Sequence, residues 1–312
     1  MNSILRYKWI ISIASLLVLI NGCAKDDDPD SQNAHELIIK VLDGNNNDIT
    51  ETDAIEDIVL YLFGEKNIFL DSIPIPIDII RNRKPVIIHY PEHAYVTASL
   101  WCNTKGPNTI EDDVNPGHHT ESPLSIRLAP FDEEDIKKRK NTSTIYKSPE
   151  DLFHGHQRVN LDISKGDPNT EFTVKRKVAS IVVIAKKLKE WSSNGADNEY
   201  HILIRGTKHA FDLVDGDLSG EDAIHWPETT FDTNGVFSSS VFNTFPSDRS
   251  QRVEVEFYKG DDCIFRATLD KDGNPLVAEP GKTLQVSVDF GSTVTVNVSV
   301  NKWYEINQDW DL

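Results

Sequence analysis

The fold is decided by two neighbouring stretches near the carboxyl end, residues 284–290 (LQVSVDF) and residues 294–300 (VTVNVSV). In both stretches apolar residues alternate with polar ones. This period of two is typical of β-strands, whose side chains point alternately to opposite faces of a sheet. The short gap between the stretches is hairpin spacing. The second stretch carries an apolar stripe formed by Val294, Val296, Val298 and Val300.

The same pattern recurs along the chain, in runs bounded by Gly, Pro, Asn and Asp. Because these boundary residues favour turns, each run predicts a separate short strand. Residues 178–188 (VASIVVIAKKL) are compatible with a strand or with a helix, since a continuous apolar run does not distinguish them. The other predicted strands are 37–41, 58–63, 85–90, 95–102, 124–128, 158–163, 172–174, 200–204, 236–242, 253–258 and 263–269.

The order of these strands predicts an all-β protein with two antiparallel sandwiches, residues 35–160 and residues 161–312. Residues 107–121 and 130–150 interrupt the first sandwich with long polar stretches that contain Pro. A helical turn is predicted near residues 132–139. We interpret both stretches as excursions on the surface.

The length and the net charge of the chain exclude some classes of function. A chain of 312 residues is long enough for about two domains. Its formal net charge is -18, because 50 Asp and Glu face 32 Lys and Arg. Proteins that bind nucleic acid need a basic surplus to displace counterions from the phosphates, so this class is excluded. With 38% hydrophobic residues, the chain is also too apolar for an acidic disordered tail.

Residues 1–22 have the three parts of a secretory signal. Arg6 and Lys8 precede an apolar run at residues 10–20, which is much shorter than the roughly 20 residues of a membrane helix. The run ends in Ile-Asn-Gly-Cys23, which resembles the bacterial lipobox, where the Cys is acylated and becomes the first mature residue. We therefore predict lipidation of Cys23. The alternatives are an unmodified thiol and an uncleaved anchor.

An acidic segment follows Cys23 directly and consists of Lys25, Asp26, Asp27 and Asp28. Such a block of charge is compatible with a solvated spacer. A Lys and several acids behind a lipidated Cys also resemble the surface-export signal of Bacteroidetes lipoproteins. Residues 23–34 as a whole predict a flexible acidic tether.

The sequence contains no recognisable catalytic, cofactor or metal-binding motif. Phosphate-binding glycine loops and the G-x-S-x-G elbow are absent. Residues 43–48 and 270–275 place Asp and Asn at alternate positions, but both lack the Gly that a calcium loop has at its sixth position. They predict turns instead. The histidine pairs at 118–119 and 154–156 are expected in polar loops, without further ligands.

Cys102 and Cys263 lie far apart, each inside an apolar run. They fit buried small hydrophobic residues or a free thiol, and a disulfide between the domains is also compatible with the sequence.

Four features resemble the FimB-type fimbrial anchor lipoproteins of Bacteroidetes, which terminate type V pili. The first is the lipobox Cys23. The second, residues 151–155 (DLFHG), is similar to the D-L-F-x-G that precedes the second domain of the family. The third, residues 176–181 (RKVASI), is similar to the R-x-V-A-x-I that opens that domain. The fourth is residues 280–284 (PGKTL) with a final strand pair that ends in Trp303 and Trp310.

This resemblance implies two tandem transthyretin-like antiparallel β-sandwiches and no enzymatic activity. It also implies assembly with fimbrial shaft subunits by β-strand exchange, in which a donor strand fills a groove that proteolysis of the first strand has opened. In an anchor the first strand, residues 37–41 here, would stay in its groove and stop chain growth. Acylated Cys23 would tie the protein, and with it the fimbrium, to the lipid of the outer membrane at the cell surface.

For the donor strand we favour residues 294–312, which include Val294, Val296, Val298 and Val300. The alternative is that these residues form the last strands of their own sheet. A second function compatible with the sequence is a fimbrial tip adhesin or a glycan-binding surface lipoprotein. Its ligand surface would use residues 107–121 and 130–150, or aromatic residues such as Trp191 and Trp226. A hydrolase with carboxylates from distant strands comes third.

Overall fold

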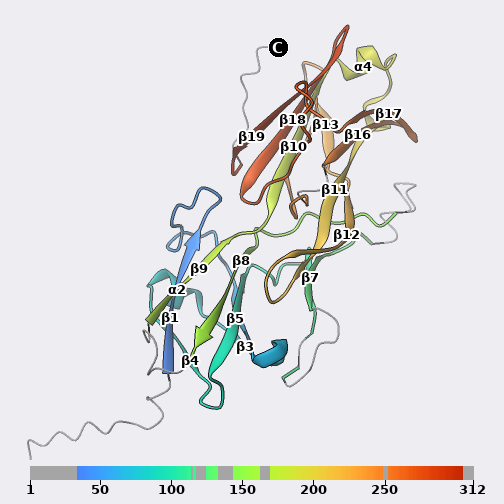
Figure 1. Ribbon diagram of the computed structural model, residues 1–312. Coiled ribbons are helices and arrows are strands. Elements are labelled where there is room, and N and C mark those ends of the chain that lie inside the picture. The colour runs from blue at the N-terminus through green and yellow to red at the C-terminus, as the bar shows by residue number, and fades with distance from the viewer. Residues whose placement is uncertain are drawn as a thin grey trace, which may run out of the picture.

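The computed structural model describes residues 34–113, 115–116, 124–132, 143–161, 169–248 and 252–304. Strands dominate these residues and form three sheets, as the predicted β class requires (Figure 1). The described helices are short: α2 (Ile77–Arg81), α4 (Leu188–Trp191), and the 3-10 turns η2 (Glu65–Asn67) and η4 (Asp197–Glu199). Within the described part of the chain, no helix has the length and apolar character needed to cross a membrane.

The first sheet has seven strands in the order β3-β2-β5-β8-β9-β1-β4. Its side chains enclose the first core, which includes Leu37, Leu60 and Phe172. The apolar run of β2 is buried on both faces, because Leu60 faces the first core while Tyr61 faces the middle sheet. The strands are β1 (Ala34–Leu42), β2 (Ile58–Phe63), β3 (Phe69–Pro74), β4 (Val86–His89), β5 (Tyr95–Cys102), β8 (Phe153–Asn160) and β9 (Asn169–Arg176).

The middle sheet has the order β17-β16-β11-β7-β6, and β12 pairs with β11 as well. It extends past both other sheets, with β16 and β17 beside the C-terminal sheet and β7 beside the first sheet (Figure 1). Its strands are β6 (Thr109–Glu111), β7 (Ser125–Leu128), β11 (Tyr200–Asp212), β12 (Leu218–His225), β16 (Glu254–Lys259) and β17 (Asp262–Ala267).

The C-terminal sheet has the order β13-β14-β10-β18-β19, with β15 also paired to β10. The two stretches with the clearest alternation become β18 and β19 of this sheet, and β10 runs parallel to β18. Residues 178–188, which the sequence left open, form β10 and the start of α4. The strands are β10 (Ala179–Lys186), β13 (Thr229–Phe231), β14 (Phe237–Ser239), β15 (Phe242–Thr244), β18 (Lys282–Phe290) and β19 (Val294–Lys302).

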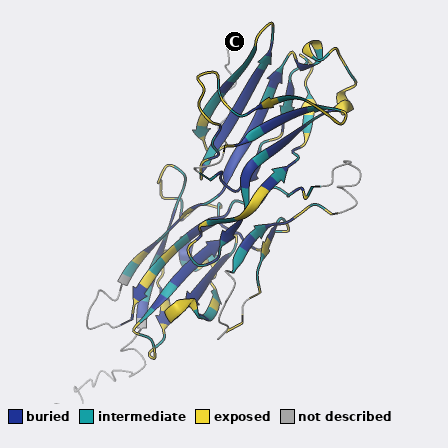
Figure 2. Ribbon diagram, turned by 45° about the vertical axis from the view of Figure 1, so that its right-hand side comes forward, coloured by how far each residue is buried: buried dark blue, intermediate teal, exposed yellow. Residues whose placement is uncertain are grey.

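The long strand β11 contributes to two cores. Ile202 and Ile204 of its first half pack against the C-terminal sheet, and Phe211 of its second half packs beside Trp101 of the first sheet. Between the halves, Gly206 has φ +85, and a Cβ there would lie 2.0 Å from the Arg252 carbonyl oxygen. A register shift against β12 occurs at the same place. Figure 2 shows buried positions along the strands of all three sheets.

The sheets do not change at the boundary predicted between residues 160 and 161. β9 still belongs to the first sheet, while β6 and β7 join β11 in the middle sheet. The prediction that residues 107–121 and 130–150 lie wholly on the surface is wrong. Residues 109–111 form β6, and Ile145 is fully buried. The helical turn predicted near residues 132–139 falls almost entirely outside the described residues.

The two described cysteines are both free. Cys102 is buried in the first core, where burial raises the pKa of its thiol. Cys263 is exposed on β17. Of the predicted alternatives, Cys102 is therefore a buried small residue and Cys263 a free thiol, and the two form no disulfide with each other.

Candidate assembly site: the first strand and the domain junction

The first strand fills its own groove in the first sheet. β1 lies between β9 and β4, parallel to β9 along most of its length and antiparallel to β4 at its start. Its alternate side chains Leu37, Ile39 and Val41 are at most 1% exposed and enter the first core. Burying each such side chain contributes about 1.5–3 kcal/mol. Removal of β1 would therefore expose a continuous apolar groove.

A tight turn follows β1, as predicted from residues 43–48. The Asp43 carboxylate accepts hydrogen bonds from the backbone N–H groups of Asn45 and Asn47, each at 2.8 Å. Burial opposes ionisation of Asp43, but these hydrogen bonds hold its pKa below the ordinary value. The second predicted turn, residues 270–275, has the same arrangement around Asp270. Both segments use their carboxylates to close a turn.

Three of the sequence motifs meet where the last strand approaches the first sheet. Arg176 donates from Nε and Nη2 to the two carboxylate oxygens of Asp151, at 2.7 and 2.9 Å. Its guanidinium also contacts the rings of Phe153 and Trp303, 4.9 and 4.5 Å from their centroids. Burial raises the pKa of Asp151, and the Arg176 guanidinium opposes this effect. One contact around Arg176 therefore joins the 151–155 motif, the 176–181 motif and the segment that contains Trp303.

A second polar contact joins the first sheet to the turn between β11 and β12. The Leu213 carbonyl oxygen accepts hydrogen bonds from Ser99 Oγ at 2.6 Å and Trp101 Nε1 at 2.8 Å. His154 lies on the Trp101 ring with centroids 4.3 Å apart, and burial lowers its pKa to about 2. The prediction that His154 and His156 occupy a polar loop is wrong. They belong to β8, whose polar side chains concealed its alternation.

The valine stripe of β19 faces the C-terminal core. All nine residues of β19 pair with β18, and Val294, Val296 and Val298 pack against that core, whereas Val300 is 48% exposed. The Lys271 N–H donates to the Val296 carbonyl oxygen at 2.8 Å, so part of the outer edge of β19 is covered. In this structure β19 serves as the last strand of its own sheet.

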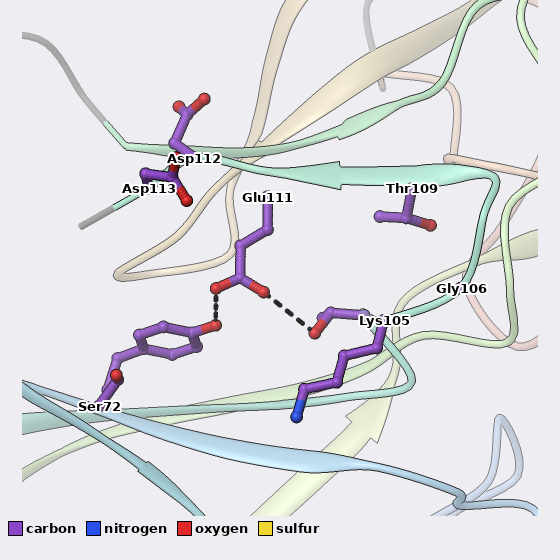
Figure 3. Close-up of a pocket in the computed structure, with 9 residues that line it drawn as sticks. Ser72, Lys105, Gly106, Thr109, Glu111, Asp112 and Asp113 are labelled. Atoms are coloured by element: carbon purple, nitrogen blue, oxygen red, sulfur yellow. Dashed lines mark hydrogen bonds between the residues drawn. The ribbon is translucent and has the colours of Figure 1, made fainter.

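A polar pocket of about 460 Å³ opens beside β2 and β6 (Figure 3). Tyr61 and Thr104 both donate hydrogen bonds to the Glu111 carboxylate, the second at 3.2 Å. Burial and the Glu111 charge raise the pKa of Tyr61. Among the residues that the structure describes, no group of three or more His, Cys, Asp or Glu side chains could hold a metal ion. The pocket thus offers hydrogen-bonding groups without a metal-binding cluster.

Several predicted site residues lie outside the described ranges. These are Cys23, Lys25, Asp26, Asp27, Asp28, His118, His119 and Trp310. Of the two candidate glycan-binding residues, Trp191 is 40% exposed and its ring contacts Phe290. Trp226 stacks on His201, with ring centroids 4.1 Å apart.

Sequence reasoning found the motifs but missed the contacts among them. Nothing in the spacing of Asp151 and Arg176 indicates that they form an ion pair. Gly44 lies in a predicted turn and Gly281 in the PGKTL motif, and nothing in either stretch indicates that their main chains approach each other closely. One signal in the sequence could have indicated these contacts. Each of the motifs combines a turn or a charged residue with an apolar run, as expected for residues at a boundary between packed sheets.

These features define a β protein whose first described strand is paired and buried in its own sheet and whose last described strand lies at a sheet edge. The chain belongs to the family described as Fimbrillin-A associated anchor proteins Mfa1 and Mfa2, which its residues 27–309 match. It is 26% identical to the major fimbrium anchoring subunit FimB of Porphyromonas gingivalis, over 96% of this chain and 97% of that protein. Membership of this family makes it a structural protein of the fimbrium at the cell surface and not an enzyme.

Solved structures share the fold. The fimbrial anchor protein Mfa2 of Porphyromonas gingivalis aligns with a TM-score of 0.62 at 14% identity, over 86% of this chain and 98% of that one. A Bacteroides thetaiotaomicron protein provisionally named as polysaccharide binding aligns with a TM-score of 0.61 at 15% identity, over 88% and 99% of the two chains. At these identities the likeness concerns the fold alone.

Proposed function

We propose that this protein anchors a fimbrium to the outer membrane and ends its polymerisation. Acylated Cys23 inserts into the lipid, and the segment from Lys25 to Asp28 directs the protein to the outer face of the membrane. Shaft subunits join it by β-strand exchange. The two domains then act as tandem transthyretin-like sandwiches that carry load from the shaft to the lipid.

The occupied groove of β1 is the observation that carries this proposal. An incoming donor strand gains affinity from main-chain pairing and register from alternating pockets. In this chain Leu37, Ile39 and Val41 already fill those pockets. A subunit whose groove is occupied accepts no further donor, so growth stops there. Because β1 is also the first described strand after Cys23, the same segment connects the fold to the lipid.

For the donor we retain residues 294–312. The edge position of β19 and its stripe of Val294, Val296 and Val298 support this choice. Donation of β19 itself requires its release from β18, which exposes apolar residues such as Val286 and Val288. Binding to a groove of a shaft subunit would bury the valines again and offset that cost.

The test uses Cys23→Ala in cells that assemble fimbriae. We expect fimbriae of normal length in the culture medium, because assembly continues without attachment to lipid. Cys263→Ala is the matched control, since Cys263 is a free, exposed thiol on β17. Fimbriae that stay on cells with Cys23→Ala would overturn the anchoring role.

Glycan binding is a second candidate function. A cavity of about 180 Å³ is lined by Tyr146, His225, Trp226, Glu228 and Phe242 among others. Aromatic rings beside a few polar groups suit the two faces of a sugar ring. Binding to a glycan array that disappears in Trp226→Ala but persists in Trp191→Ala would favour this function. Absence of binding by the unaltered protein would count against it.

A further inference from the structure

The turn that ends β1 packs against the turn that begins β18. A Cβ on Gly44 would lie 2.1 Å from the Gly281 carbonyl oxygen, so the two main chains are in direct contact. Gly281 has φ +68, the left-handed conformation that favours glycine. Its N–H donates to the carbonyl oxygen of Val178 at 2.7 Å, which fixes the 280–282 turn to the residue that directly precedes β10. A shift of either turn would open this contact.

Side chains reinforce the contact between the turns. Lys282 Nζ donates to Asn45 Oδ1 at 2.6 Å. Lys175 Nζ, from β9, donates to Asn46 Oδ1 at 3.1 Å. Both hydrogen bonds are exposed to solvent, so each contributes modestly. Three consecutive residues of the 43–48 turn are therefore engaged by neighbours far away in the sequence.

The 43–48 turn is also joined closely to β1. The Val41 N–H donates to Thr50 Oγ1 at 2.9 Å, and the Val41 carbonyl oxygen accepts from the Ile49 N–H at 2.9 Å. The chain thus folds back on the end of β1 immediately after the turn. If β1 left its groove from this end, the turn would have to unfold or separate from the 280–282 turn.

We infer that the contact between the 43–48 and 280–282 turns keeps β1 in its groove against competing donor strands. Gly44 and Gly281 are positioning residues for this retention. The inference rests on the proposed function and adds the contact by which the C-terminal domain controls the groove. A tethered strand already competes well because its effective concentration is high. The contact between the two turns acts in addition, because it makes β1 leave its groove less often.

Hydrogen exchange of the full chain in detergent tests this directly, because it reports opening of individual strands. In the unaltered protein we expect the amides of β1 to be protected as well as those of β2. In Gly44→Val, whose Cβ collides with Gly281, exchange in β1 should rise roughly tenfold or more while β2 is unchanged. Gly273→Asn is the control, since Gly273 has φ +83 in a turn with open space around it.

If Gly44→Val does not fold, the double variant Asn45→Ala, Asn46→Ala replaces it in the same experiment. Hydrogen exchange in β1 should then rise roughly threefold. A labelled peptide with the sequence of residues 34–42 should enter the groove faster in the same variants. Unchanged β1 protection, or an equal loss in β1 and β2, would overturn the inference. The Cys23→Ala experiment tests anchoring separately. If fimbriae detach from cells with Cys23→Ala but β1 stays protected in Gly44→Val, only the inference about the contact between the turns is refuted.

Discussion

The Arg176 guanidinium holds the Asp151 carboxylate by two hydrogen bonds, of 2.7 and 2.9 Å, in contact with the ring of Trp303. The Arg176 side chain is only 7% exposed. This pair joins Asp151, just before β8, and the last residue of β9 to Trp303, just after β19. It therefore connects the first sheet with the C-terminal sheet.

Loss of this ion pair should strongly destabilise the protein. Removing one partner of a buried pair leaves an uncompensated charge, so Arg176→Ala should lower the free energy of unfolding by about 3–5 kcal/mol. Lys40→Ala is the control, because it breaks an exposed pair with Glu171 and should cost below about 1 kcal/mol. Urea denaturation measures both, and similar small losses would contradict the role of Arg176.

Two buried histidines predict a loss of stability in acid. Burial lowers the pKa of His154 to about 2 and that of His225 to about 4, both from 6.5. Below pH 6.5 the unfolded chain therefore binds more protons than the folded chain, and stability falls as the pH drops toward about 4. Each histidine contributes a slope of up to about 1.4 kcal/mol per pH unit.

The measurement is urea unfolding at about pH 7 and about pH 5, which lie on either side of the ordinary histidine pKa. The unaltered protein should lose stability between them. The double variant His154→Gln, His225→Gln should lose less over the same interval, whatever its starting stability. An equal loss in both proteins would show that other groups set the acid sensitivity.

Much of the fold could be predicted from local pattern. The alternation at residues 284–290 and 294–300 predicted the positions of β18 and β19 closely, and the apolar run at residues 58–63 predicted β2. The sequence did not predict that β11 contributes to two cores. Its two halves pack against different sheets, and the local residue pattern does not indicate which sheet each half contacts. β8 was predicted only in part, because the polar residues His154, His156 and Gln157 leave its first half without an apolar alternation.

The candidate site was predicted less completely. Retention of the first strand is implied by the family resemblance and stays a prediction, while the structure shows β1 buried in its sheet. The contact of Gly44 with Gly281 joins residues far apart in the chain, and its energy lies in main-chain approach rather than in distinctive side chains. Single-sequence patterns report local periodicity, so they do not reveal such a contact.

The acidic segment behind Cys23 predicts export to the cell surface. Replacing Lys25, Asp26, Asp27 and Asp28 together with Ala should abolish cleavage of the protein by protease added to intact cells. Total protein should stay unchanged, because the replaced residues precede β1, the first described strand. Asp261→Ala with Asp262→Ala is the control for lost charge, at the β16–β17 turn. Unaltered protease sensitivity would refute the export signal.

Donation by the C-terminal segment predicts that β19 must separate from β18. Gln285 and Ser299 are directly opposite across the pair, so Cys at both positions should form a disulfide, in a Cys263→Ser background. The oxidised protein should fail to join shaft subunits, and reduction should restore assembly. Equal assembly of the oxidised and reduced forms would mean that β19 stays in its sheet and that any donor lies after it.

As an anchor, this protein should occupy the end of the fimbrium that is attached to the cell. Immunogold electron microscopy of intact cells, with antibody to residues of the exposed β16–β17 turn, measures this position directly. The anchor role predicts label confined to the base of each fimbrium, at the membrane. Label at the distal tip or along the shaft would contradict it.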